Sequence, residues 1–314
     1  MTLTELKYIV AVAREKHFGR AAEACFVSQP TLSVSIKKLE EELGVRIFER
    51  GANEVSVTPL GDEIVRQAQS VIEQAAGIKE IAKRRKDPLT GPLRLGVIYT
   101  IGPYLLPDLV RQAIERVPQM PLMLQENFTA RLLDMLRTGE LDCAIMAEPF
   151  PDTGLAIAPL YDEPFMVALP KAHPLAKRKS IDAEELKDEK MLLLGTGHCF
   201  RDHVLEVCPE YARFASDAEG MRKTFEGSSL ETIKYMVASG MGLTVVPRLS
   251  VTPETQAQPH VVYVPFAKPV PTRRVVLAWR RSFTRYEAIA ALRNVIYACP
   301  LQGVKRLTEL AEAP

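Results

Sequence analysis

The first sixty residues alternate short runs of helical periodicity with turns. Apolar positions recur every three or four residues in 3–13 and again in 31–43. The apolar face of the second run consists of Leu32, Ile36, Leu39 and Leu43. Ser28 can cap this helix, Pro30 at its first position costs no hydrogen bond, and Gly44 can end it. The pattern predicts a helix, a short turn at "VSQP", and a second helix.

The opposite face of the second helix is polar. It consists of Gln29, Thr31, Ser33, Ser35, Lys37 and Lys38. Such side chains can reach base edges and phosphates when a helix lies in the major groove of DNA. An amphipathic helix in an ordinary bundle would show the same pattern. The next segment, "VRIFERGANEVSVTPLG", has two short β-prone runs around a turn, which favours a wing beside a recognition helix.

A long helical stretch from Pro59 to Lys86 follows the predicted wing. Its narrow apolar stripe consists of Leu60, Ile64, Val71, Ile72, Ile78 and Ile81. A long, mostly polar helix with such a stripe needs a partner helix, so we expect dimerisation here. The final "KRRK" can face phosphate, or it can complement the negative end of the helix dipole.

The stretches "GRAAEACFVSQPTLSVSIKKLEEELGVRIFER" and "TPLG" resemble the N-terminal part of LysR-type transcriptional regulators. The resemblance implies a mostly α winged helix-turn-helix domain over residues 1–58 that binds promoter DNA. It also implies a dimerising linker helix with a hinge over residues 59–91. The DNA contacts that we expect are Ser28, Gln29, Pro30, Thr31, Ser33, Lys37, Lys38 and Arg50.

Beyond "KDPLTGP" the periodicity changes to alternating strands and helices. "LRLGVIYT", "MPLMLQENFT" and "CAIMAEP" are predicted strands, with helices between them. The same alternation of strands and helices continues through "FMVALPKAHPL", "MLLLGTG" and "RRVVLAWR", and it predicts parallel sheets. Two α/β lobes joined by crossing strands fit the length, with lobe I at about 92–162 and 267–314 and lobe II at about 163–266. The LysR resemblance likewise implies a two-lobed, periplasmic-binding-protein-like regulatory domain over residues 92–314.

Composition excludes several classes of protein. The length of 314 residues has room for two or three domains. The net charge of +1 gives no strong overall electrostatic field, so any contact with DNA must depend on a local group of residues. It has neither a membrane-length apolar run nor a signal-peptide pattern, and its five cysteines are irregularly spaced. We therefore expect a cytoplasmic protein with reduced thiols. The absence of GxGxxG, GxxxxGK[ST], HExxH and CxxC motifs predicts no nucleotide cofactor and no metal.

The segment "GHCFRDHVLEVCPE", residues 197–210, places Cys199 and Cys208 nine positions apart. Its helical spacing would put Cys199 near a helix N-terminus, where Arg201 and His198 can each favour the thiolate. Nine helical steps of about 1.5 Å separate the two cysteines by about 13 Å, whereas a disulfide needs Cα atoms within about 7 Å. A disulfide would therefore unwind the helix. Alternatively, both thiols are simply small buried apolar groups.

Three predicted strands end in polar residues, at the edge where α/β sheets bind ligands. Thr100 ends the first strand, and Thr129 follows the second, where it can also cap the next helix. Residues 195–199 end a strand of the other lobe. The two hydroxyls and the His198–Cys199 pair are therefore candidate contacts for a small polar ligand.

"GTGHCFRD" followed by Cys208 is similar to the redox segment of the hydrogen peroxide-sensing subfamily of LysR-type regulators. The resemblance implies that Cys199 is the peroxidatic, redox-active residue and that Cys208 resolves it. The peroxide pocket that it implies consists of Thr100, Thr129, Gly197, His198, Arg201 and Asp202. Its other implications are a regulator rather than an enzyme, RNA polymerase as a further partner, and a homo-oligomer that is a dimer of dimers. The predicted core thiols are Cys25, Cys143 and Cys299, and His203 is expected to be packed or solvated rather than a second base.

Two other functions remain open from the residues alone. A LysR-type regulator can bind a small organic anion between its lobes, and Ser228 and Ser229 at a helix start would suit one. That function would survive Cys199→Ser, whereas peroxide sensing would not. The third possibility is a thiol peroxidase enzyme, in which the DNA-binding pattern would have no role.

Overall fold

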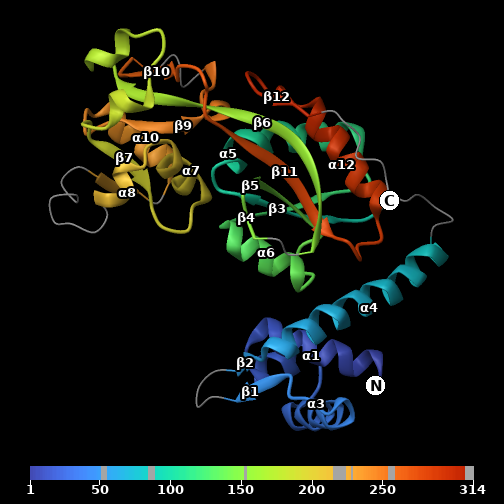
Figure 1. The fold of residues 1–314 in the computed structure, drawn as a ribbon. Coiled ribbons are helices and arrows are strands. Elements are labelled where there is room, and N and C mark those ends of the chain that lie inside the picture. Colours follow the sequence, from blue (N-terminus) through green and yellow to red (C-terminus); the bar gives the residue numbers. More distant parts are fainter. Residues whose placement is uncertain are drawn as a thin grey trace.

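The structure, a computed structural model, describes residues 1–50, 55–83, 89–151, 154–214, 224–227, 229–253 and 259–307. Figure 1 shows a small helical domain at one end, a long helix leading from it, and a larger α/β part with two lobes. Three separate hydrophobic cores correspond to the small domain and to the two lobes. No helix among the described residues is long and apolar enough to cross a membrane.

The small domain is a helix-turn-helix with a two-stranded wing. Its elements are α1 (Leu3–Glu15), α2 (Phe18–Ala24), α3 (Gln29–Leu43), β1 (Phe48–Arg50) and β2 (Val55–Val57). The predicted helices and wing strands are confirmed, and β1 pairs antiparallel with β2. Residues 51–54, where the wing turn was expected, lie outside the described residues.

Local hydrogen bonding explains where α3 begins. The Ser28 side chain accepts from the backbone N–H of Thr31 at 3.3 Å, as expected of an N-cap. The helix begins at Gln29, so Pro30 is its second residue and not its first as predicted. Leu43 is 39% exposed and does not belong to the buried face. It lies in the last turn of α3.

The long helix α4 (Pro59–Lys83) packs along α1. Val65 and Ala68 are its buried contacts with the first core, whereas Leu60 and Ile78 of the predicted stripe are 49% and 69% exposed. The apolar stripe is thus divided between the domain's own core and a face open to solvent. The side chain of Ile81 and most of the "KRRK" run lie outside the described residues.

Lobe I has three parallel strands with helices packed against them. The strands are β3 (Leu93–Ile98), β4 (Leu122–Asn127) and β5 (Cys143–Glu148), and the helices are α5 (Gly102–Arg116), α6 (Thr129–Arg137) and α12 (Tyr286–Ala298). Strand β3 lies between β4 and β5. The carboxyl ends of β3 and β4 therefore lie side by side, as the sequence predicted.

Lobe II contains the second set of elements. Its strands are β7 (Met191–Leu194), β8 (Thr224–Gly227), β9 (Thr244–Pro247) and β10 (Val261–Pro265), and its helices are α7 (Cys199–Val207), α8 (Glu210–Phe214) and α10 (Leu230–Ala238). Three 3₁₀ turns are η1 (Pro174–Lys177), η2 (Ala183–Leu186) and η3 (Arg248–Ser250). Strands β7 and β8 are parallel.

Two long strands connect the lobes, as predicted. They are β6 (Leu155–Pro170) and β11 (Thr272–Arg280), which pair antiparallel, and the short β12 (Lys305–Arg306) pairs with β6. One part of β6 pairs with β11, and its other end pairs with β9 and β10 in lobe II. Figure 1 shows both strands running from one lobe to the other. The main sheet is therefore mixed and not purely parallel, because the crossing strands return antiparallel.

Candidate functional site

A small cavity lies where the carboxyl ends of β3 and β4 face the start of α7. It is lined by Ile98, Tyr99, Thr100, Asn127, Phe128, Thr129, Gly197, His198 and Cys199. Its volume is about 170 Å³, including space open to solvent. The enclosed part has room for about one water-sized molecule. The structure thus brings together five of the residues predicted for a redox pocket.

Aromatic rings form one wall of this cavity. The ring of His198 lies 4.8 Å from that of Phe128 and 5.9 Å from that of Tyr99, and the latter two rings are 5.2 Å apart. Tyr99 and Phe128 were not predicted from the sequence. Their signal was present, since each immediately precedes one of the two predicted threonines. These rings cover one side of the space beside Cys199.

Thr129 supplies an unpaired hydroxyl to the cavity. Its Oγ1 is buried and has no hydrogen-bond partner among the described residues. The helix α6 begins at Thr129 itself, and its N-cap is Phe128, so Thr129 does not cap it. Leaving a buried hydroxyl unpaired is costly, so this group is suited to bind something that enters the cavity.

Thr100 is held in place by a buried ion pair. Arg273 donates to its Oγ1 at 2.7 Å and to its carbonyl oxygen at 3.0 Å. The same guanidinium pairs with Glu163 at 2.8 Å, and both charged side chains are only 1% exposed. Glu163 also accepts from the backbone N–H of Leu249 at 2.7 Å. Because Arg273 occupies an acceptor site of the Thr100 hydroxyl, the hydroxyl proton remains available to donate.

Arg273 also connects this ion pair to the cysteine helix. Its guanidinium lies 5.1 Å from the centroid of the Phe200 ring, and Phe200 directly follows Cys199. Arg273 and Glu163 were not predicted from the sequence. Their signal was a charge placed within apolar strand segments, at "RRVVLAW" and "DEPFMVAL". Crossing strands, cavity and cysteine helix thus form one connected unit.

The two cysteines lie at opposite ends of α7. Cys199 is its first residue, half-buried, and packs against the core of lobe I. Cys208 follows its last residue, is fully buried, and belongs to the core of lobe II. The Cys208 N–H donates to the Val204 carbonyl at 2.9 Å, so helical hydrogen bonding reaches the second cysteine. The predicted helix between the two thiols is confirmed.

Burial makes Cys208 unreactive in this arrangement. It raises the pKa of its thiol to about 12, and the carboxylates of Glu210 and Glu184 add to the shift. A thiol attacks only as its thiolate, so Cys208 cannot act until it leaves the core.

Two predicted pocket residues do not line the cavity. Arg201 donates to the Leu194 carbonyl at 3.0 Å, and Asp202 is exposed to solvent. Each residue of an α-helix is rotated by about 100° from the one before it, so these positions turn away from the opening beside Cys199.

His203 is packed, as predicted, and contacts lobe I from α7. It is 4% exposed, and its Nε2 lies 2.7 Å from the Glu148 carbonyl oxygen, to which it must donate. Its Nδ1 is buried without a partner among the described residues, and burial lowers the pKa of the ring. His203 thus stabilises the contact between α7 and β5 in its neutral form.

The remaining thiols are structural. Cys143 and Cys299 are buried in the core of lobe I, as expected, and burial raises the pKa of Cys299 to about 11. Cys25 is half-buried at the end of α2 and only packs against its core. Among the described residues, no group of three metal-ligating side chains is close enough to hold a metal ion.

The polar face of α3 is open to solvent. Gln29, Pro30, Thr31, Lys37 and Lys38 are exposed, Ser28 is exposed but caps the helix, and Ser33 is partly covered. Val34, which was not predicted as a surface residue, is 67% exposed on the same helix. The side chain of Arg50 lies outside the described residues.

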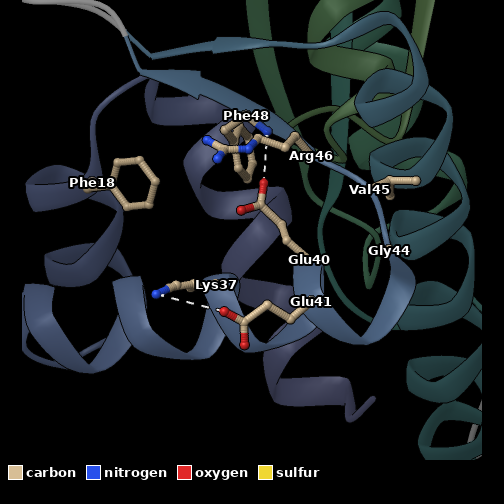
Figure 2. A pocket seen from close by; sticks show the side chains of 8 residues that line it. All are labelled: Phe18, Lys37, Glu40, Glu41, Gly44, Val45, Arg46 and Phe48. Carbon is tan, nitrogen blue, oxygen red and sulfur yellow. Dashed lines mark hydrogen bonds and ion pairs between the residues drawn. The ribbon is translucent and has the colours of Figure 1, made fainter.

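A groove separates the C-terminal half of α3 from the wing, as Figure 2 shows. Glu40 accepts from the backbone N–H groups of Ile47 and Phe48 at 2.7 and 3.1 Å, which joins strand β1 to α3. Lys37 forms an exposed ion pair with Glu41 at 3.7 Å. The wing is thereby held in a fixed position beside the exposed face of α3.

The alternative anion site is only partly described. Ser228 lies outside the described residues, and Ser229 is the N-cap of α10 without a side-chain capping bond. No observation here favours an anion at this helix start over the redox cavity.

Two family models match the chain. Residues 3–62 match the bacterial regulatory helix-turn-helix protein of the lysR family, and residues 86–298 match the LysR substrate binding domain. The "DNA-binding transcriptional dual regulator OxyR" of Escherichia coli K12 is 40% identical over 92% of this chain and 94% of its own length. The "Hydrogen peroxide-inducible genes activator" of Haemophilus influenzae is 38% identical over 97% of this chain and its full length.

Solved structures of OxyR proteins are also similar to this chain. A full-length OxyR from Pseudomonas aeruginosa with a cysteine-to-aspartate substitution is 52% identical, covers 99% of both chains and has a TM-score of 0.82. A cysteine-to-serine OxyR variant from Corynebacterium glutamicum with hydrogen peroxide bound is 34% identical, with a TM-score of 0.62 over 95% of this chain and 92% of that one.

Proposed function

The chain belongs to the LysR family of bacterial transcriptional regulators, in its OxyR group of hydrogen peroxide sensors, and we propose that it senses peroxide through Cys199 and Cys208. One observation carries the assignment of residues. The two thiols lie at opposite ends of one helix and pack in different cores, and Cys199 lines the cavity that also holds the Thr129 hydroxyl, which has no partner among the described residues.

Hydrogen peroxide binds in the cavity beside Cys199 in this proposal. The hydroxyls of Thr100 and Thr129 donate to its oxygens, and His198 lies against it on the aromatic side. The Cys199 thiolate attacks one oxygen, the O–O bond breaks, and the other oxygen leaves as hydroxide, which becomes water on protonation. Cys199 is oxidised to sulfenic acid while the peroxide is reduced.

The second step joins the two cysteines. The Cys208 sulfur attacks the Cys199 sulfur, the S–OH bond breaks, and the oxygen leaves as water with the thiol proton. This step requires Cys208 to leave the core of lobe II, because about 13 Å of helix otherwise separates the residues. Oxidation therefore unwinds α7 and removes its contacts with both lobes. The redox reaction is thereby converted into a change of shape.

Peptide mapping after stoichiometric peroxide tests the assignment. A crosslink between Cys199 and Cys208 is expected in the full-length chain and is lost in Cys199→Ser. The matched control is Cys25→Ser, which retains the crosslink because Cys25 lies in the DNA-binding domain. Oxidation of another thiol without this crosslink would contradict the proposal.

Thr129→Val tests the pocket separately. The variant keeps the shape of the side chain, and Thr129 Oγ1 makes no hydrogen bond among the described residues. We therefore expect slower oxidation of Cys199 and a melting temperature that is not lowered, because no hydrogen bond is lost and a costly unpaired hydroxyl is removed. An unchanged oxidation rate would exclude Thr129 from the peroxide pocket.

The exposed face of α3 binds promoter DNA in this proposal. Removing a base contact with Gln29→Ala should cost about 1–3 kcal/mol on the specific site and little on random DNA. Lys38→Ala should weaken binding to both DNAs alike, and Lys7→Ala, exposed on α1, is the control for loss of charge. Equal losses on both DNAs for Gln29→Ala would mean that α3 does not read the sequence.

The assembly is a further part of the proposal. The exposed Leu60 and Ile78 of α4 support pairing with a second copy, and we expect a dimer of dimers that also contacts RNA polymerase at promoters. We place the domains at residues 1–58, 59–91 and 92–314. Substituting Ile78 with Glu should shift the full-length chain to smaller species in sedimentation experiments.

Peroxide acts here as a signal and not as a substrate for turnover. Each oxidation leaves the chain in a disulfide form that must be reduced before it can react again. Sustained peroxide consumption at enzyme rates by the chain with a reductant would instead indicate a thiol peroxidase.

A further inference from the structure

A second cavity lies between the long helix α4 and lobe I, away from the redox cavity. Its walls come from α4, the end of α6, the start of β6 and the end of β11. Four of the residues that line it are arginines: Arg66, Arg137, Arg280 and Arg281. None of the described residues that line it is acidic. Its volume is about 550 Å³, including space open to solvent.

The arginines are not fully neutralised. Asp62 and Asp134 form partly exposed ion pairs with Arg66 and Arg137 at 3.4 and 3.2 Å. Arg281 is exposed and forms no ion pair with any of the described residues. A guanidinium has five N–H donors, so one carboxylate contact leaves several of them available.

One of the remaining donors is buried. Nε of Arg137 is shielded from solvent and has no hydrogen-bond partner among the described residues. An unpaired donor on a charged group is expensive to bury, and a bound anion would relieve that cost.

Packing fixes the position of a third arginine. Arg280, 7% exposed, forms an ion pair with Glu73 of α4 and donates through Nη1 to the Leu141 carbonyl at 2.6 Å. Glu73 also accepts from Ser282 at 2.5 Å and from Gln69 at 2.8 Å. The cavity therefore exists only while α4 is docked on lobe I.

We propose that this cavity binds a phosphate-type oxyanion. Arginine forks match the oxygens of phosphate in paired hydrogen bonds, and the hydroxyl of Ser70 lies in the same wall. The phosphate group comes either from a free ion or small phosphorylated molecule, or from the backbone of bound DNA.

Such a ligand would act on the arrangement of the domains. Because the site is built from both α4 and lobe I, the anion binds the docked arrangement and stabilises it by mass action. It therefore holds the linker helix, and with it the DNA-binding domain, in a fixed position relative to the redox domain. The redox cavity has no part in this binding, so the proposal stands independently of peroxide sensing.

Calorimetric titration of the reduced full-length chain with sodium phosphate tests the proposal, against sodium chloride at equal ionic strength. Saturable phosphate binding is expected, and Arg137→Gln and Arg281→Gln should each weaken it about tenfold or more. The control is Arg131→Gln on the same helix α6, whose guanidinium pairs with Glu140 and does not line the cavity. It should bind phosphate like the unsubstituted chain.

The salt dependence of DNA binding distinguishes the source of the phosphate. If the group comes from DNA, Arg281→Gln lowers the slope of log K against log salt by about one, and Arg131→Gln does not. If the ion is free, the slope is unchanged and direct phosphate binding is lost in Arg281→Gln. The proposal is overturned if phosphate binding does not saturate below about 10 mM and Arg281→Gln also leaves the salt slope of DNA binding unchanged. Equal effects of Arg131→Gln and Arg281→Gln would overturn it as well.

Discussion

Val204→Ala tests whether α7 must unwind when the disulfide forms. Val204 lies within α7, is only 3% exposed and belongs to the core of lobe II together with Cys208. The substitution removes two carbon atoms from a packed site. At about 0.8 kcal/mol for each, with a further term for the cavity, the reduced form loses about 2 kcal/mol.

If α7 unwinds, the packing of Val204 in the core of lobe II is already absent in the disulfide form. The substitution then destabilises only the reduced state, so the disulfide becomes more favourable by about 2 kcal/mol, or roughly 30-fold in the equilibrium constant. Since 30 mV corresponds to about 1.4 kcal/mol for a two-electron couple, the reduction potential should become more negative by about 40 mV.

Redox titration in dithiothreitol buffers, with alkylation and mass spectrometry of the 199–208 peptide, measures this shift. The matched control is Val245→Ala on β9, which is 1% exposed in the same core but lies outside the cysteine segment. It should lower the stability of both redox forms and leave the potential nearly unchanged. Equal shifts in the two variants, or none in Val204→Ala despite lower stability, would refute the reasoning.

Three further predictions concern the surroundings of α7. Arg273→Ala leaves Glu163 buried without its partner and should cost about 3–5 kcal/mol in urea unfolding, whereas the neighbouring surface pair of Arg274 should matter little. Burial raises the pKa of the Cys208 thiol from 9.0 to about 12. While α7 stays intact, Cys208 should therefore be alkylated about a thousandfold more slowly near neutral pH in the folded reduced chain than in the unfolded one. Burial lowers the pKa of His203 from 6.5, so the folded chain loses stability as the pH falls below that value, because the unfolded chain binds a proton that the buried ring resists. His203→Gln should therefore reduce the drop in melting temperature between pH 7 and pH 5.5, and an unchanged drop would assign it to other groups.

Periodicity identified the elements that carry the chemistry. Local signals were sufficient for α3 and α7, because the apolar spacing lies within each segment and Ser28 directly precedes α3 as its cap. The ends of parallel strands also placed Thr100 and Thr129 beside each other correctly, since β3 and β4 are neighbours in the sheet.

Long-range packing was not predictable in the same way. The ion pair of Arg273 with Glu163 joins residues 110 positions apart, and only the folded sheet brings them behind Thr100. The division of the two cysteines between separate cores likewise depends on how α7 is packed between the lobes. The resemblance placed Arg201 and Asp202 in the pocket, but the rotation of the helix turns them away from it.

Hydrogen exchange of residues 199–208 tests the central claim most directly. In the reduced chain, amides of α7, including the Cys208 N–H bonded to Val204, should be protected. After stoichiometric peroxide, formation of the crosslink should coincide with loss of that protection, while strands β3 and β11 keep theirs. A crosslinked chain in which α7 stays as protected as before would show that the disulfide forms without unwinding, and would contradict the account.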